Sequence, residues 1–304
     1  MRLIAINLGC LQPAVGTAAP CAKAAVAETA ARGVIPSTRQ KMLAEPVAKK
    51  SPSFRLDGRT ALVTGAGAGI GEGIAFGLAE AGATVVLVGR TAESLRQSAA
   101  RIDEAGFNKA SVRVCDVLDV DAVKAMISQL PSLDILINNA GTNIPEPFLD
   151  VPEEHFDAIM TLNARGSFFV AQAATRKMLD DPARAAKGGA VVNVTSQMGH
   201  VGSPNRTVYC MSKHALEGLT KAMAVELAPH RIRVNSIAPT FVDTPLVRRI
   251  VDTPEKRAFL VSKIPMGEMA RVEDVVGAAV FLSSPAAAMI TGACLLVDGG
   301  WTAQ

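Results

Sequence analysis

The sequence predicts an α/β fold, a single Rossmann-like, doubly wound domain whose seven-stranded parallel sheet is flanked by helices. From Phe54 onward, short apolar runs rich in β-branched residues alternate with longer helical patterns. Strands that alternate with helices are joined by right-handed crossovers, which produce a parallel sheet. Ala, Gly and Val dominate, whereas aromatic residues make up only 4% of the chain. Small side chains of this kind suit helices packed closely on a sheet that is buried on both faces.

The individual elements follow from the spacing of the apolar residues. The expected strands are apolar runs, several of them unbroken, at Thr60–Thr64, Thr84–Val88, Ser111–Cys115, Ile135–Ile137, Ala190–Thr195, Arg233–Ile237 and Ala293–Val297. The expected helices have the longer period and lie at Ile70–Ala81, Ala92–Glu104, Val120–Gln129, Glu153–Met178, Tyr209–Leu227 and Val272–Leu282. The sequence contains no internal repeat and no sign of a second domain, so residues 54–304 are expected to form one domain.

Residues 1–53 differ from the rest and are predicted to be a disordered N-terminal extension. They are Ala-rich, hold several prolines and show little periodicity. A start placed too early, with Met42 as the true beginning, is one alternative. A targeting segment is the other, because an apolar stretch follows Arg2 and basic residues outnumber acidic ones, as in signal or transit peptides.

Charge and cysteine content exclude several classes of protein. The formal net charge is +3, and residues 1–50, with seven basic and two acidic residues, carry +5, which leaves −2 for the remainder. A nearly neutral body gives no electrostatic reason to expect a nucleic-acid partner. No apolar run approaches the length of a membrane span. The five cysteines and four histidines show no disulfide or metal-ligand spacing, so we predict no metal and a reducing, cytoplasmic location.

A glycine-rich turn directly follows the first expected strand and opens a helix. It reads Thr-Gly-Ala-Gly-Ala-Gly-Ile-Gly over residues 64–71. Glycine is needed where a backbone turns sharply and approaches a pyrophosphate, and the helix N-terminus offers free N–H groups to that anion. The turn therefore predicts a dinucleotide site formed by Gly65, Ala68, Gly69, Ile70 and Gly71. The alternative is a tight strand-to-helix turn that binds nothing.

Tyr209 and Lys213 are four residues apart at the start of a helix and share one face of it. Tyrosine alone is a poor acid or base at neutral pH, since its ordinary pKa is about 10. We expect the neighbouring ammonium to lower the pKa of Tyr209. Ser196 ends the strand before this helix and is expected to hold a substrate oxygen beside the phenol. The alternatives are a surface Tyr–Lys pair and a serine that merely terminates a strand.

Two further polar segments follow or interrupt apolar elements. Asn138-Asn139-Ala140-Gly141 closes the fourth strand, where a small turn suits contact with a cofactor. Asn163 is a polar residue within an apolar helix. Because buried amides need partners, Asn163 is either a hydrogen bonder inside the helix or part of a proton path.

Together and in this order, these motifs resemble the short-chain dehydrogenase/reductase family in its single-domain, Thr-Gly-x-x-x-Gly-x-Gly form. The resemblance covers about residues 54–304, including the ending Val-Asp-Gly-Gly-Trp at 297–301. It implies that Tyr209 is the catalytic acid and base and that Lys213 holds the nicotinamide ribose and depresses the tyrosine pKa. It also implies that Ser196 orients the substrate oxygen and that Asn163 supports a water leading from Lys213 to solvent.

The resemblance also assigns contacts to the cofactor. Asp116, with Val117 beside it, matches the position that meets the adenine amine. Asn139, Ala140 and Gly141 would flank the adenosine ribose. The segment gripping the carboxamide corresponds to Pro239, Val242 and Thr244. The chain departs from the family at Thr240, where glycine usually follows the proline, and a Cβ there would reshape the floor near the nicotinamide.

The second strand runs into Gly89-Arg90-Thr91, and this ending favours NADP over NAD. NAD-preferring members carry an acid there that binds the ribose 2′-hydroxyl. Gly89 takes the place of that acid, and Arg90 is able to pair with a 2′-phosphate. The alternatives are a solvated Arg90 and an NAD-preferring enzyme.

The resemblance implies an oxidoreductase that transfers a hydride between NADP(H) and the secondary alcohol or carbonyl of a small-molecule substrate. It also implies a homotetramer or homodimer, built by pairing the long helices. Ser196, Met198, Asn205 and Tyr209 are the expected substrate contacts. The polar residues expected around them favour a sugar, polyol or keto acid: Thr142, Asn143, Gln197, His200 and Arg206. A 3-oxoacyl thioester reductase of fatty-acid metabolism is the alternative. A cofactor sensor or scaffold on this fold would typically lack the Tyr or Lys, and a methyltransferase on a related sheet would need neither.

Overall fold

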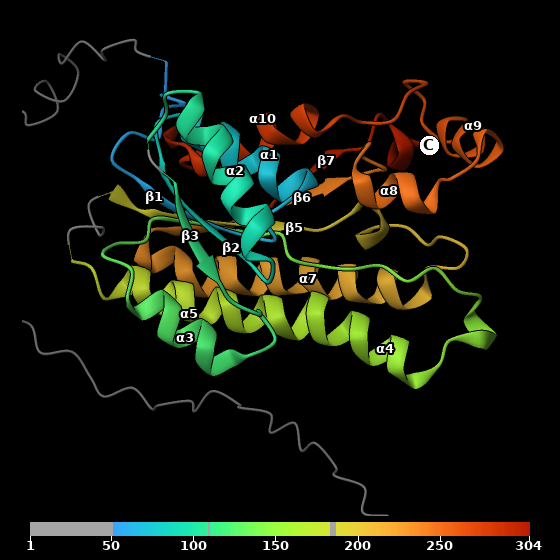
Figure 1. Ribbon diagram of the computed structural model, residues 1–304, viewed down its shortest axis with the longest axis horizontal. Helices are drawn as coiled ribbons and strands as arrows, with labels where there is room; N and C mark the ends of the chain where they lie inside the picture. The colour runs from blue at the N-terminus through green and yellow to red at the C-terminus, as the bar shows by residue number, and fades with distance from the viewer. Residues whose placement is uncertain (1–50, 109, 183–186) are drawn as a thin grey trace, which may run out of the picture. The chain divides into compact units, whose positions relative to one another are not determined.

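A parallel sheet of seven strands forms the centre of the computed structural model, which describes residues 51–304 except 109, 183–186 and the side chain of Leu246 (Figure 1). The strand order is β3-β2-β1-β4-β5-β6-β7, and every neighbouring pair is parallel. The strands span β1 Thr60–Thr64, β2 Thr84–Gly89, β3 Ser111–Val114, β4 Ile135–Asn138, β5 Gly189–Val194, β6 Ile232–Pro239 and β7 Cys294–Val297. The predicted doubly wound parallel sheet is confirmed.

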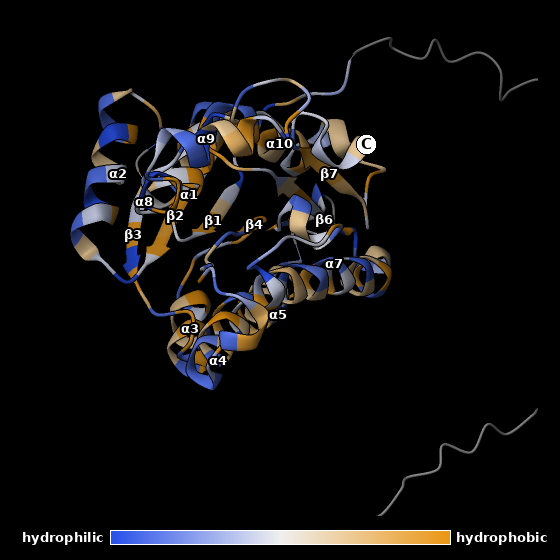
Figure 2. Cartoon of the chain, turned by 90° about the vertical axis from the view of Figure 1, so that its right-hand side faces the viewer, coloured by the Kyte–Doolittle hydropathy of each residue, from blue (hydrophilic) through white to orange (hydrophobic). Residues whose placement is uncertain are grey.

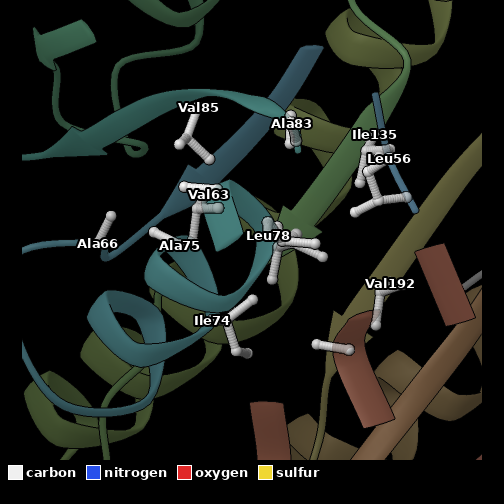
Figure 3. Close-up of a cluster of buried hydrophobic side chains, with 14 of the residues drawn as sticks. Leu56, Val63, Ala66, Ile74, Ala75, Leu78, Ala83, Val85, Ile135 and Val192 are labelled. Atoms are coloured by element: carbon white, nitrogen blue, oxygen red, sulfur yellow. The ribbon is translucent and has the colours of Figure 1, made fainter. Parts of the chain in front are cut away.

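Helices cover both faces of the sheet, and the alternation of side chains along each strand divides the core into two layers (Figures 1 and 2). Val63 of β1 packs on one face with the helices α1, α2 and α10, as Figure 3 shows for the α1 side, whereas its neighbour Leu62 packs on the other face with α3 and α5. The helices of the first face span α1 Gly69–Glu80, α2 Ala92–Glu104 and α10 Val272–Ser283. Those of the second face span α3 Val120–Ser128, α4 Glu153–Met160, α5 Ser167–Leu179 and α7 Thr207–Leu227.

Strand β1 lies between β2 and β4, so the strand order reverses there. In doubly wound folds, ligands bind outside the carboxyl ends of the strands at such a reversal. The glycine turn follows β1 and the Asn138–Gly141 segment includes the end of β4, so the fold brings both predicted cofactor segments to this point.

The long helix predicted for Glu153–Met178 is wrong in one respect. A π-helical segment, Thr161–Gly166, separates α4 from α5. Gly166 packs directly against Val117, where a built Cβ would lie 3.5 Å from the Val117 side chain. The π segment contains Asn163, and π segments of this kind are frequent at functional sites.

Two short helices after β6 were not predicted, namely α8 Pro245–Ile250 and α9 Pro254–Val261. Each begins with a Thr-Pro pair, in which the threonine hydroxyl caps the helix and the proline occupies its first position. Thr244 accepts from Val247 N and Thr253 from Lys256 N, both at 3.3 Å. The capping signal was present in the sequence, but the helices are too short for a periodic pattern.

The described residues, from 51 onward, belong to one compact unit. The domain bounds 54–304 stay a prediction. The predicted extension over residues 1–53 lies almost wholly outside the described residues and stays a prediction. Among the residues that the structure describes, no helix combines the length and apolarity needed to cross a membrane.

Candidate active site

A cavity of about 300 Å³ opens at the carboxyl ends of the central strands. Its wall comes from the glycine turn, the segments that follow β4, β5 and β6, and the first turns of α7. The predicted residues that line it are Gly65, Ala68, Gly69, Ile70, Gly71, Asn139, Ala140, Gly141, Thr142, Asn143, Ser196, Gln197, Met198, Tyr209, Lys213, Pro239, Val242 and Thr244. Phe241 and Thr240 also lie in the wall. Sequence segments from about residue 65 to residue 244 therefore meet in a single pocket.

The glycine turn has a shape that side chains would destroy. Gly65 and Gly69 have φ angles of +66° and +60°, in the left-handed region that favours glycine. A Cβ on Gly71 would overlap the carbonyl oxygen of Gly65. Helix α1 begins at Gly69, so its first N–H groups face the cavity as an anion-binding cradle.

Hydrogen bonds join this turn to the end of β4. The Thr64 hydroxyl oxygen accepts from the backbone N–H groups of Asn139 and Ala140 at 2.9 and 3.0 Å. In return, the Asn139 amide donates to Thr64 O at 2.9 Å. The side chain of Asn139 thus holds the loop after β1 against the loop after β4. Asn139, Ala140 and Gly141 still line the pocket.

Ser196 lies two residues after the end of β5, which ends one residue earlier than predicted, and it caps the short turn η3 at Gln197–Gly199. Its hydroxyl accepts from Met198 N at 3.1 Å and donates to the Gln197 side chain at 2.7 Å. It also forms a hydrogen bond with Tyr209 that favours the phenolate. The predicted meeting of the serine hydroxyl and the phenol is therefore present.

Lys213 is 5% exposed and donates to Val194 O at 2.8 Å, with its Nζ 5.6 Å from the centre of the Tyr209 ring. Burial lowers the pKa of Lys213 from its usual 10.5 to about 8, against the charge of Glu217, which raises it.

The predicted lowering of the tyrosine pKa is wrong for this state of the protein. Desolvation raises the pKa of Tyr209 to about 12, and it outweighs the opposing effects of the Ser196 hydrogen bond and the Arg206 charge. The loss of hydration destabilises the phenolate more than the hydrogen bond and the nearby positive charge stabilise it. Tyr209 therefore keeps its proton at neutral pH.

Asn163 is fully buried and acts as a hydrogen-bonding bridge. Its amide donates to Thr142 O at 2.9 Å and Ser212 Oγ at 3.0 Å, while its oxygen accepts from Thr142 N at 2.8 Å. Of the two alternatives, the structure supports the hydrogen bonder, which ties the π segment to the loop after β4 and to α7 behind Tyr209.

Some predicted residues are not part of the cavity wall. Arg90 is exposed in the bend after β2. Asp116 accepts from Leu118 N at 3.0 Å, and Val117 is buried in the core layer that packs on α3 and α5. Asn205 is exposed with a φ of +58°. His200 and Arg206 also lie outside this wall. Spacing alone does not show how far a loop side chain stands from a pocket.

Other functional features were missed. Glu217, one helical turn after Lys213, is 5% exposed and receives hydrogen bonds from Thr195 and Ser236. The i, i+4 spacing on the helix was the available signal. Another is the ring of Trp301, which packs on Phe241 of the cavity wall with centroids 5.9 Å apart.

Two buried polar atoms of the cavity wall have free hydrogen-bonding capacity that a ligand could use. Within the described residues, Asn143 Oδ1 and Thr240 Oγ1 are buried without a hydrogen-bond partner. Both residues line the cavity, and Thr240 is the position at which the chain departs from the glycine of the family. Buried polar atoms without partners are costly, so these two favour a polar ligand. Together with the glycine cradle, they fit a dinucleotide and a polar substrate.

Several known proteins are similar to this chain over most of its length. A family model described as enoyl-(acyl carrier protein) reductase matches residues 65–302. L-xylulose reductase of Bos taurus is 42% identical over 250 residues, which cover 82% of this chain and 99% of that protein. D-erythrulose reductase of Gallus gallus is 40% identical over 256 residues, covering 82% and 98%. The crystal structure of a gluconate 5-dehydrogenase from Burkholderia cenocepacia J2315, in complex with NADP and tartrate, superposes with a TM-score of 0.78 at 37% identity, covering 83% and 98%.

The depressed pKa of Lys213 predicts that the free energy of unfolding depends on pH above about pH 8, and Lys213→Met should remove this contribution. Between about pH 8 and 10.5 the unfolded chain holds a lysine proton that the folded chain has lost, so this group makes stability rise with pH by up to about 3 kcal/mol. Urea unfolding of both proteins without nucleotide from pH 7 to 10 measures it. The stability of the wild type relative to the variant should increase across this window, and a constant difference would contradict the assignment.

Proposed function

Because the chain belongs to the short-chain dehydrogenase/reductase family of NAD(P)-dependent alcohol oxidoreductases, we propose that it interconverts the secondary alcohol and carbonyl of a sugar or polyol with NADP(H). The observation that carries the proposal is the meeting of Ser196, Tyr209 and Lys213 beside the glycine cradle in one cavity.

The residues of the cavity fit a nicotinamide dinucleotide. Gly65, Gly69 and Gly71 would receive the pyrophosphate at the N-terminus of α1. The Asn139–Gly141 segment would border the adenosine ribose, and Lys213 would hold the nicotinamide ribose. Pro239, Val242 and Thr244 would contact the carboxamide, with the free hydroxyl of Thr240 beside them. When bound, the cofactor supplies or accepts the hydride.

The protein's own part is to move a proton and to orient the substrate oxygen. With a pKa of about 12, Tyr209 is protonated at neutral pH and is suited to donate to a carbonyl oxygen that is being reduced. The Ser196 hydroxyl, fixed by Met198 N and Gln197, would hold that oxygen in place. For oxidation of an alcohol, Tyr209 must instead act as a base and lose its proton. Desolvation opposes this loss, and a dinucleotide bound beside Lys213 would change the charges around the phenol.

The polar wall favours a hydroxylated substrate over an acyl thioester. Ser196, Thr142, Asn143 and Gln197 present hydroxyl and amide groups to the cavity, and Met198 adds an apolar contact. Two of the relatives are named for the ketoses that they reduce, and the solved neighbour is a sugar-acid dehydrogenase crystallised with tartrate. Asn205, an expected substrate contact, lies outside the wall and stays a prediction.

A substrate screen tests this function. We expect NADPH oxidation with ketoses and keto sugar acids, and NADP reduction with polyols. Tyr209→Phe should lower kcat roughly 100- to 10,000-fold while NADPH affinity, measured by fluorescence, is retained. Preference for 3-oxoacyl thioesters would replace the proposed substrate class. Full activity in Tyr209→Phe, or binding of S-adenosylmethionine in place of NADPH, would contradict the mechanism.

We propose that Arg90 confers preference for NADP over NAD, although both are accepted by the fold. Gly89 leaves no carboxylate beside the 2′ position, and the exposed guanidinium follows directly. A charge-assisted pair of this kind is worth about tenfold in affinity.

The cofactor preference is measurable in one variant. Arg90→Ala should raise KM for NADPH about tenfold and leave KM for NADH unchanged, because only the phosphate contact is lost. Arg96→Ala is the matched control, since Arg96 is an exposed arginine on the following helix, paired with Glu93. Equal effects on both nucleotides, or a larger wild-type kcat/KM with NADH, would overturn the assignment.

We also propose that the enzyme is a cytoplasmic homotetramer, or a homodimer, that pairs the α4–α5 and α7 helices. Apolar residues are exposed on these helices, including Phe156, Phe168 and Val225. Light scattering after size exclusion should give a mass near four or two times 31.6 kDa. Phe168→Arg should reduce that mass, and a wild-type monomer would contradict the proposal.

A further inference from the structure

Three side chains that are far apart in the sequence lie close together beside Thr195, which follows β5, and Ser236 of β6. His200 follows η3, Glu217 lies on α7, and Cys294 begins β7. His200 Nε2 is 3.1 Å from Cys294 Sγ and 3.4 Å from Glu217 Oε1. The distance between Cys294 Sγ and Glu217 Oε1 is 3.5 Å. One nitrogen, one oxygen and one sulfur donor thus face a common point.

These separations match those of ligands that share a tetrahedral metal ion. Zinc binds histidine nitrogen and carboxylate oxygen at about 2.1 Å and cysteine sulfur at about 2.3 Å. A tetrahedral angle at these lengths requires ligand atoms about 3.4 to 3.6 Å apart. Two of the three observed separations lie in or near this range, and the third needs an outward movement of a few tenths of an ångström by the partly exposed His200.

The carboxylate of Glu217 is held in place by hydrogen bonds, as metal-binding carboxylates usually are. Glu217 Oε1 accepts from the Thr195 hydroxyl at 2.6 Å, and Oε2 accepts from Ser236 at 2.8 Å. Glu217 is 5% exposed, so its position is fixed by packing as well. Outer hydrogen bonds of this kind orient metal ligands and are important for affinity.

The cluster has an opening on the solvent side. The His200 side chain is 31% exposed, and Cys294 is partly buried. An ion therefore has an access route, and a water molecule has room to complete a fourth ligand position.

We propose that His200, Glu217 and Cys294 form a binding site for a zinc-type divalent cation, separate from the dinucleotide cavity. A nitrogen, oxygen and sulfur donor set suits zinc, whereas magnesium and calcium prefer oxygen ligands alone. None of the three residues lines the catalytic cavity. The bound ion would join η3, α7 and β7, which carry or adjoin Ser196 and Tyr209.

Binding to the full-length protein tests the site directly. The protein is treated with a chelator, and ZnCl₂ is then titrated by calorimetry in a Cys10→Ser/Cys21→Ser background, which removes the two N-terminal thiols as competitors. We expect one zinc ion per chain and a higher Tm with zinc but not with magnesium. Titration with cobalt should give thiolate-to-metal charge-transfer absorption and the bands of a tetrahedral ion.

Ligand variants separate this site from adventitious binding. His200→Ala and Cys294→Ser should each weaken zinc binding roughly 100-fold or more and abolish the cobalt–thiolate absorption. His155→Ala is the matched control, because His155 forms another histidine–carboxylate pair, with Glu146 at 2.7 Å. Cys115→Ser is the thiol control. Sub-stoichiometric binding, or binding that survives His200→Ala and Cys294→Ser, would overturn the proposal and leave only a hydrogen-bonded cluster.

Discussion

The hydrogen bond from Lys213 to the carbonyl of Val194 is the contact on which the catalytic arrangement depends. It joins the second turn of α7 to the last residue of β5. Ser196, two residues after that strand, and Tyr209, one turn before the lysine, are therefore brought close together. The cost is the burial of an ammonium, which lowers its pKa to about 8. The buried carboxylate of Glu217 on the next turn offsets part of this cost, and Thr195 and Ser236 hold that carboxylate in turn. The site is therefore supported from behind by a continuous polar network through the end of the sheet.

Much of the fold was predictable because the buried strands leave a simple trace in the sequence. The seven strands appear within two residues of their expected bounds, since most of them are short, largely apolar runs between polar segments. What the pattern did not reveal was local geometry. The π segment lies within the expected helix Glu153–Met178, and the apolar pattern of the sequence does not distinguish it from the α-helical turns on either side. Helices α8 and α9 are too short to show a period at all.

The site was predictable to a similar extent, for a related reason. Parallel strands place their carboxyl ends together, so motifs that directly follow strands, such as the glycine turn and Ser196, were correctly brought to one pocket. Protonation was not predictable in this way. The sequence shows that Lys213 stands near Tyr209, but only the structure shows that desolvation dominates and raises the tyrosine pKa. The His200, Glu217 and Cys294 cluster was invisible for the same reason, because its members come from three elements that are adjacent only in space.

The packing of Trp301 on Phe241 ties the carboxyl-terminal residues to the cavity wall. Asp298 closes this last turn by accepting from Gly300 N, Thr302 N and the Thr302 hydroxyl. Met266 N also donates to Gly299 O, which draws the segment after α9 into the same contact. A substitution at Trp301 would therefore reach Phe241, so the shape of the cavity wall can be altered from the last residues of the chain.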